Sequence, residues 1–358
     1  MQRGEELSQR VGSDAERFTV LTMLGTILTF RGNLEGSLEN TKTALELAER
    51  TGDPSMIAAA CGNAATALWI SGRLAEALQS AQRSMRAGRI KAERSKFAYI
   101  PSAAETAAFV LLLLGYPDQA ERANREALET VKQSGHGASA VAPDELNAAI
   151  RSSFLYIPMQ RPDRVRDLTR PALEVAQQAS LAFEIGRTSL FLGWAIARLG
   201  NPDEGIAMIR GGIAQASTTG VYPMFLTAFT LTDALVRAAR YEEALVTLDE
   251  VLSDPNYSSP FVMTAELHRL KGEAILGRDP SAITEAENCF SKAIEVARGQ
   301  SAKWYELRAT TSLARVLANQ GKRHEARAML AEMYNWFTEG FDTADLKDAR
   351  ALLDELSN

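Results

Sequence analysis

The feature that most constrains the fold of this chain is a sequence motif that recurs about every forty residues. In it, a glycine or a similar stop closes one apolar helix, and an acidic, alanine-containing segment opens the next. The motif reads GNLEGSLENTKTALELA from Gly32, GRLAEALQSAQRSM from Gly72, GYPDQAERANREAL from Gly115, GNPDEGIAMIRGGI from Gly200, RYEEALVTLDEVL from Arg240 and GKRHEARAMLAEMY from Gly321. Because one helical hairpin cannot bury its apolar face alone, this period predicts a stacked array of hairpins.

One small residue aligns eight such units, and it lets the second helix of each hairpin approach the first. The eight positions are Ser37, Ala77, Ala120, Val165, Gly205, Ala244, Ala286 and Ala326. Successive positions differ by 39 to 45 residues, which fits two helices and two turns. A second, mostly small site follows seven residues later, on the same helix face. The sequence therefore predicts an all-α fold, a right-handed superhelical solenoid of about eight hairpins.

The two ends of the chain depart from the repeat. Residues 1–12 match in pattern the close of a second helix, so we expect a remnant of a preceding hairpin and a chain cut from a longer protein. We expect the solenoid over residues 13–340. Residues 341–358 then predict an amphipathic helix with its leucines on one face, which is the terminal cap that such an array requires.

Composition and charge exclude several classes of function. The 39 basic and 45 acidic residues give a net charge of −6 without any long single-sign block, so we expect no nucleic-acid partner and no polybasic membrane patch. The longest apolar run, 107–114, is far shorter than the roughly twenty residues of a spanning helix. The first residues are too charged for a signal peptide. We therefore expect a cytoplasmic protein with no membrane partner.

The sequence carries no catalytic or cofactor-binding pattern. His136, His268 and His324 lie far apart, and none has the spacing of an HExxH or Cys/His metal site. Neither a phosphate-binding GxxxxGK[ST] loop nor a GxSxG nucleophile elbow is present. We therefore expect no enzyme activity, no cofactor and no metal site.

The inner wall of the array is the expected binding surface, because ligands of such solenoids generally lie on the first helices. Eleven residues before each small residue, or thirteen in the seventh unit, the sequence has Thr26, Thr66, Phe109, Phe154, Trp194, Asp233, Glu273 and Arg315. The three aromatic residues predict a continuous apolar groove between a polar side and a charged side. The charged side is formed by Asp233, Arg269, Glu273 and Arg315. The alternative is that the aromatic side chains fill the space between neighbouring hairpins.

Two kinds of binding protein fit this pattern. An open groove would favour an interaction scaffold for a peptide or a partner helix, whereas a closed apolar pocket with converging polar groups would favour a domain for a small-molecule effector. The sequence specifies neither the partner nor the oligomeric state.

The combination of small residue, turn glycine and Ala-Leu resembles the tetratricopeptide repeat in a variant of about forty residues. Four stretches also resemble the carboxy-terminal repeat region of bacterial proteins that join a class III nucleotidyl cyclase, a predicted STAND-type ATPase and a repeat array. They begin at Leu111, Phe191, Ala265 and Trp304, and the last includes FTEGFDT, which serves no repeat geometry. This resemblance implies a sensor or oligomerisation arm, with the cyclase and ATPase residues upstream of the array and absent from this chain.

Overall fold

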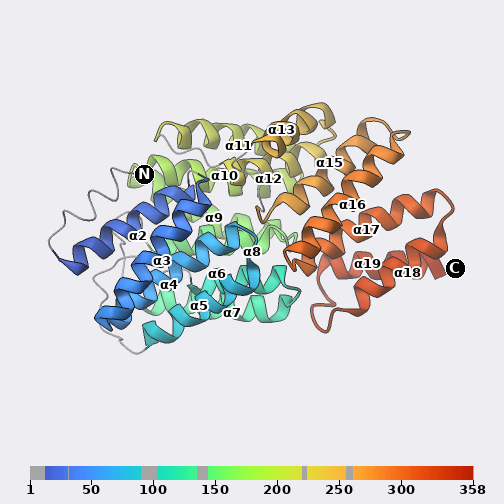
Figure 1. The fold of residues 1–358 in the computed structure, drawn as a ribbon. Coiled ribbons are helices and arrows are strands. Elements are labelled where there is room, and N and C mark those ends of the chain that lie inside the picture. The colour runs from blue at the N-terminus through green and yellow to red at the C-terminus, as the bar shows by residue number, and fades with distance from the viewer. Residues whose placement is uncertain are drawn as a thin grey trace.

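The chain folds into pairs of helices, and the small residues that recur in the sequence lie on the second helix of each pair. The computed structural model describes residues 13–30, 32–89, 103–134, 144–219, 224–254 and 261–357, and these ranges contain helices and no strand. The hairpins are α2 (Asp14–Phe30) with α3 (Leu34–Thr51), α4 (Pro54–Ile70) with α5 (Leu74–Arg89), α6 (Ala103–Leu113) with α7 (Pro117–Ser134), α8 (Asp144–Tyr156) with α9 (Pro162–Gln178), α10 (Ala182–Arg198) with α11 (Pro202–Ser217), α12 (Met224–Arg237) with α13 (Tyr241–Ser253), α15 (Thr264–Arg278) with α16 (Ile283–Gly299), and α17 (Lys303–Asn319) with α18 (Arg323–Asn335). A last helix, α19 (Ala344–Ser357), follows them (Figure 1).

The second helix of every hairpin packs through the small residue that the sequence aligns. All eight of these residues are buried, from Ser37 on α3 to Ala326 on α18. Their small side chains let two helix backbones approach closely, so each hairpin buries one apolar stripe and leaves its polar face to solvent. The prediction of an all-α solenoid of eight hairpins is confirmed.

Seven of the eight hairpin turns use a left-handed residue five positions before the small residue. Glycine supplies it at Gly32, Gly72, Gly115, Gly200 and Gly321, with φ between 74° and 110°. Two hairpins use a residue with a side chain instead, Gln160 at φ 55° and Ala239 at φ 57°. Because this conformation costs a residue with a Cβ roughly 1–2 kcal/mol, these two positions call for a compensating reason.

The pair α10 and α11 packs more closely than alanine would allow. A Cβ on Gly193 would lie 2.7 Å from the carbonyl oxygen of Gly205, and a Cβ on Gly186 would lie 2.6 Å from that of Gly212. The two glycines of each helix therefore form the contact surface itself. This pair lies in the middle of the array and fixes the helix that carries Trp194.

The superhelix closes on itself, because its last hairpin returns to the third and fourth. Helix α17 packs against α6, and Trp304 Nε1 on α17 donates a hydrogen bond to the carbonyl oxygen of Pro158 at 3.3 Å. Closer to the middle of the chain, the amide of Val262 donates to the carbonyl oxygen of Ile70 at 3.0 Å. These contacts join the C-terminal half of the chain to the turn ends of the second, third and fourth hairpins.

The last helix buries the face that the sequence predicts. Leu346, Ala349, Leu352 and Leu356 of α19 are buried, and α19 packs against α17 and α18. The domain boundaries at residues 12 and 340 stay predictions. Residues 1–12, for which a remnant helix is expected, and His136 lie outside the described residues. In the ranges that are described, no helix is both long enough and apolar enough to cross a membrane.

Candidate functional site

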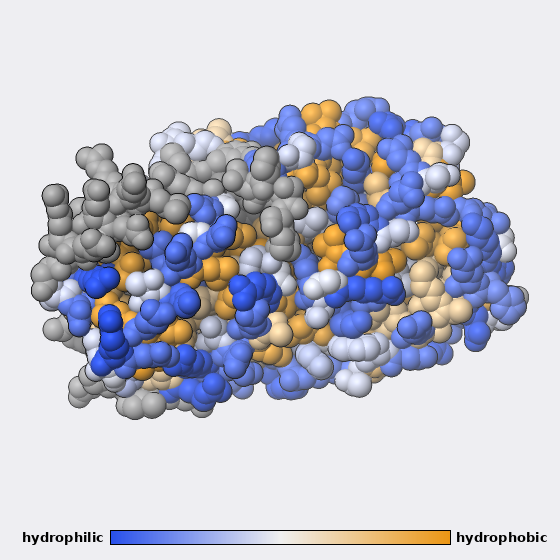
Figure 2. Space-filling model, viewed as in Figure 1, coloured by the Kyte–Doolittle hydropathy of each residue, from blue (hydrophilic) through white to orange (hydrophobic). Residues whose placement is uncertain are grey.

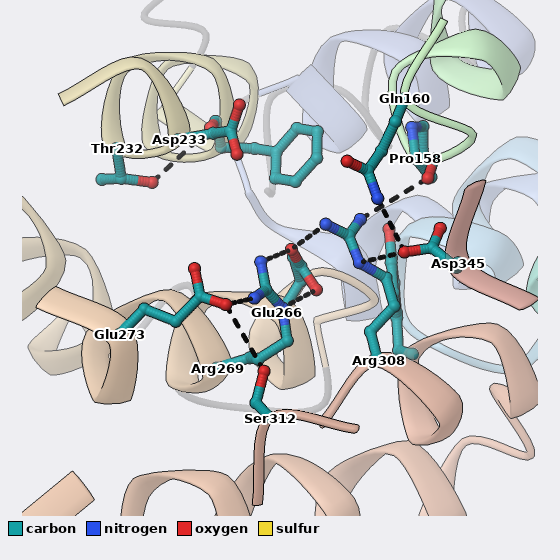
Figure 3. Close-up of polar contacts among 12 residues, drawn as sticks. Pro158, Gln160, Thr232, Asp233, Glu266, Arg269, Glu273, Arg308, Ser312 and Asp345 are labelled. Atoms are coloured by element: carbon teal, nitrogen blue, oxygen red, sulfur yellow. Dashed lines mark hydrogen bonds and ion pairs between the residues drawn. The ribbon is translucent and has the colours of Figure 1, made fainter. Parts of the chain in front are cut away.

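A cluster of charged side chains lies on the inner wall, and we call it the inner cluster. It consists of Arg198, Asp233, Arg237, Glu266, Arg269, Glu273, Arg308 and Asp345, and Figure 3 shows most of them in contact. Four are acidic and four are basic, so the cluster is balanced in charge. They come from α10, α12, α15, α17 and α19, and all except Arg237 and Glu273 are largely buried.

Arg269 is the centre of the cluster on α15. Its Nε and Nη2 donate to the two carboxylate oxygens of Glu266 at 2.9 and 2.6 Å, and its Nη1 pairs with Glu273. Burial alone would lower the pKa of Arg269, but the charges of Glu266 and Glu273 outweigh it and raise that pKa. The spacing of three and four residues places both carboxylates on the arginine's own helix face.

Arg308 of α17 connects this pair to the end of the chain. Its Nη2 lies 3.3 Å from Glu266 Oε1, and its Nε lies 3.5 Å from Asp345 Oδ1. Its Nη1 donates to the carbonyl oxygen of Pro158 at 3.5 Å. One buried guanidinium therefore connects three elements that are far apart in sequence.

Asp345 is the least satisfied anion of the cluster. Its Oδ1 accepts a hydrogen bond from Gln160 Nε2 at 2.7 Å, while its Oδ2 is buried and has no hydrogen-bond partner among the described residues. Burial raises the pKa of Asp345, and the charge of Arg308 offsets this only in part. An unpaired buried carboxylate oxygen is costly, so this end of the cluster is held less firmly than the Arg269 end.

Asp233 is in the opposite situation. It accepts a hydrogen bond from Trp194 Nε1 at 2.7 Å, and Arg198 and Arg237 lie 3.8 and 3.9 Å from its carboxylate. Burial would raise the pKa of Asp233, but Arg198 and Arg237 outweigh it, so that pKa lies below its usual value. Asp233 is therefore an ionised carboxylate held by neighbours on both sides.

The structure brings together four of the residues that the sequence places on the inner wall: Trp194, Asp233, Arg269 and Glu273. Arg315 lies apart from these four residues, and its exposed side chain pairs with Asp348 of α19. Phe109 and Phe154 belong to a different cluster, in which Trp69 packs against both, with ring centroids 5.1 and 5.4 Å away.

The expected open aromatic groove differs from what the structure shows. Phe109 and Trp194 are 2% and 1% exposed, and Phe154 is half-buried. Phe109 packs between Trp69 of α4 and Phe154 of α8, with ring centroids 5.1 and 5.9 Å away, so it fills the space between neighbouring hairpins. The aromatic side chains fill core space, and Arg237 and Glu273 are the partly exposed members of the inner cluster. On the face that Figure 2 shows, apolar residues are interspersed with hydrophilic ones.

Sequence reasoning missed Glu266, Arg308, Gln160 and Asp345. The first two had a signal, because they lie seven residues before Glu273 and Arg315, on the same helix faces. Gln160 and Asp345 had none, because they belong to a turn and to the segment after the repeats. Within the described residues, no group of His, Cys, Asp and Glu side chains could hold a metal ion.

Comparisons with known proteins agree with this architecture. The sequence model of the tetratricopeptide repeat matches residues 307–332, which span most of α17 and most of α18. The fold is a tetratricopeptide-like solenoid. A Rap protein complexed with Competence and Sporulation Factor aligns with a TM-score of 0.62 at 12% identity, over 98% of this chain and 91% of that one. NprR in complex with its cognate peptide NprX aligns with a TM-score of 0.51 at 13% identity, over 80% and 81%. No curated protein matches the sequence.

Proposed function

We propose that this tetratricopeptide-like solenoid is a non-catalytic interaction scaffold, which takes a peptide segment of a partner protein on its inner wall. The observation that carries the proposal is the inner cluster. First helices of successive hairpins supply fixed donors and acceptors of both charge signs, and Arg237 and Glu273 form its more exposed edge. A peptide offers the complementary groups along its backbone and side chains.

The likeness to NprR supports the same function by fold alone, since that protein is described in complex with a peptide. We extend the proposal to the sensor arm of a bacterial signalling protein, because of the resemblance to cyclase and STAND ATPase fusions. In that setting, any cyclase or ATPase activity would reside in domains outside this chain. A small-molecule effector on the same wall is the alternative, and the experiment below distinguishes it.

The test is a selection of binding peptides from a random library displayed on phage, with the purified full chain as bait. Selected peptides are then measured against Arg237→Ala, Glu273→Ala and, as a matched control on the outer helix α13, the exposed Glu250→Ala. The proposal expects a loss of about tenfold or more in affinity for the two inner variants, because charge-assisted hydrogen bonds contribute ~1.5–3 kcal/mol each.

Glu250→Ala is expected to bind like the unchanged chain. Peptides that bind all three variants equally would contradict the inner-wall site. If no peptide is selected and native mass spectrometry of the purified chain shows a bound metabolite, the effector alternative replaces the proposal.

A further inference from the structure

The segment between α18 and α19 contacts the third hairpin, α6–α7, and we call residues 336–343 the strap. The sequence contains it as WFTEGFDT, a stretch that the repeat does not explain. The amides of Asp118 and Gln119, in the first turn of α7, both donate to Glu339 Oε1 at 3.0 Å. Gln119 Nε2 donates to Glu339 Oε2 at 3.2 Å. Glu339 therefore caps the amino end of a helix that lies more than two hundred residues earlier.

The strap and the turn before α7 fit each other in shape. The Trp336 ring lies against Gly115, where a Cβ would approach the ring to 2.4 Å. Lys303 Nζ lies 5.5 Å from the centre of the same ring, and the Tyr116 ring lies 6.0 Å from it. In the opposite sense, a Cβ on Gly340 would approach Pro117 to 2.0 Å. The turn before α7 has a glycine where Trp336 approaches it, and the strap has a glycine where Pro117 approaches it.

The strap is continuous with the weakest part of the inner cluster. Two residues after its end, Asp345 enters the cluster and contacts Gln160 and Arg308. Asp345 Oδ2 is buried there without a hydrogen-bond partner among the described residues. The closed form therefore has a buried polar atom without a hydrogen-bond partner in the described part of the chain, and release of the strap would let water reach that atom. The strap therefore leads directly in sequence to a residue of the inner cluster.

We propose that the strap is an internal ligand that holds the superhelix closed, and that a partner segment with an aromatic residue three positions before a carboxylate opens the superhelix by replacing it. This spacing is that of Trp336 and Glu339. The proposal rests on the proposed function for its consequence, because opening gives a partner access to the inner cluster. The recognition itself needs the ring site beside Gly115 and the two amides of α7 that donate to Glu339 in the closed form.

The first arm of the test measures closure. Spin labels are placed at the exposed Arg122 of α7 and the exposed Asp342 of the strap, with the partly exposed Cys289 replaced by Ser. The distance between the labels is compared for Gly340→Ala and Gly321→Ala. Both glycines have a positive φ, 77° and 82°, but only Gly340 faces an atom that a Cβ would meet. The two variants therefore share the backbone cost and differ in the clash.

The expected result is a short, narrow distance distribution for the unchanged chain and for Gly321→Ala, and a longer, broad one for Gly340→Ala. Glu339→Gln is measured in parallel, so that a fold defect of Gly340→Ala does not decide the outcome. It is expected to broaden the distribution as well. An unchanged distribution in folded Gly340→Ala and Glu339→Gln chains would overturn the proposal.

The second arm measures the partner chemistry with a synthetic peptide of the strap, YNWFTEGFDTAD, and its counterpart with glutamine in place of glutamate. Fluorescence anisotropy is expected to show binding of the first peptide to Gly340→Ala and at least tenfold weaker binding of the second. Equal affinities, or equal binding to the unchanged chain, would overturn the assigned partner chemistry. This arm measures binding at the α7 site, whereas the library selection measures binding at Arg237 and Glu273. Either proposal can therefore fail while the other holds.

Discussion

Gln160 joins the middle of the chain to its end, since Gln160 Nε2 donates to Asp345 Oδ1 at 2.7 Å across 185 residues of sequence. The other end of the same amide, Oε1, accepts from Arg198 Nη2 at 2.8 Å. Gln160 occupies the left-handed turn position that glycine occupies in five other hairpins. A side chain is thus kept at a position where the backbone favours glycine, and the two hydrogen bonds are the compensating interaction.

This relationship predicts opposite effects of glycine at two equivalent turns. Ala239→Gly should stabilise the chain by about 0.5–1 kcal/mol, because it relieves a left-handed alanine whose side chain is exposed. Gln160→Gly should destabilise it by roughly 1–2 kcal/mol, since the lost hydrogen bonds outweigh the same relief. Urea unfolding followed by circular dichroism measures both. Equal stabilisation by the two variants would show that the Gln160 hydrogen bonds contribute nothing.

The two buried aspartates of the inner cluster should respond differently to neutralisation. Asp233→Asn should destabilise the chain by roughly 3 kcal/mol at pH 7, because it leaves buried Arg198 without its carboxylate neighbour. Asp345→Asn should cost less than about 1 kcal/mol, since Arg308 keeps Glu266 and an asparagine oxygen can still accept from Gln160. Equilibrium unfolding of the two variants tests this order, and a larger loss for Asp345→Asn would reverse our account of which anion is well held.

The same pair predicts opposite pH dependences. The folded-state pKa of Asp233 is lowered, so its stabilisation is present above the ordinary pKa of 3.8 and is lost as the pH falls through the folded value. The folded-state pKa of Asp345 is raised, so its contribution is full below 3.8 and is lost as the pH rises through the folded value. Difference curves of stability against pH for each Asn variant should therefore slope in opposite directions; parallel curves would contradict the two assignments.

His268 should make the chain less stable in mild acid. Burial, with Lys271 and Lys292 nearby, lowers the pKa of His268 from 6.5 to about 4. The folded state thus favours the neutral ring, and its stabilisation is full above pH 6.5 and is lost as the pH falls toward 4. Because the ring is only partly buried, we expect on the order of 1–2 kcal/mol. Thermal unfolding of His268→Gln between pH 7 and about 4 should lose this slope, whereas the exposed His324→Gln should keep it.

Close packing of α10 on α11 predicts opposite signs for two glycine substitutions. Gly193→Ala should destabilise the chain by about 1–3 kcal/mol, because its Cβ would lie 2.7 Å from the Gly205 carbonyl oxygen and 2.8 Å from Ile209. Gly211→Ala should stabilise it by about 0.5–1 kcal/mol, since nothing lies within 4 Å and alanine favours the helix. Denaturation midpoints measure both, and a tolerated Gly193→Ala would show that the helices can separate at little cost.

The fold was predictable because its signals are local. A small residue such as Ala77 and a turn glycine such as Gly72 act within one hairpin, and the period then determines how hairpins stack. Closure of the superhelix was not predictable, since it depends on contacts such as Gln160 with Asp345 that no repeat unit contains. Phe109, assigned to an open groove, lies in the core because Trp69 and Phe154 of the neighbouring hairpins pack against it.

The candidate site was predictable in part for the same reason. Asp233 follows from the eleven-residue register, and the spacing of four residues places Arg269 and Glu273 on one helix face. The seven-residue period extends these faces to Glu266 and Arg308. From the sequence, the segment FTEGFDT could be recognised only as a departure from the repeat. Its contact with α7 required the three-dimensional structure.

The most direct test of an inner-wall scaffold is hydrogen–deuterium exchange of the full chain with and without a library-selected peptide. We predict slower exchange in α12, α15 and α17, which carry most of the inner cluster, and no change in the outer helices α13, α16 and α18. Protection confined to those outer helices would contradict the account.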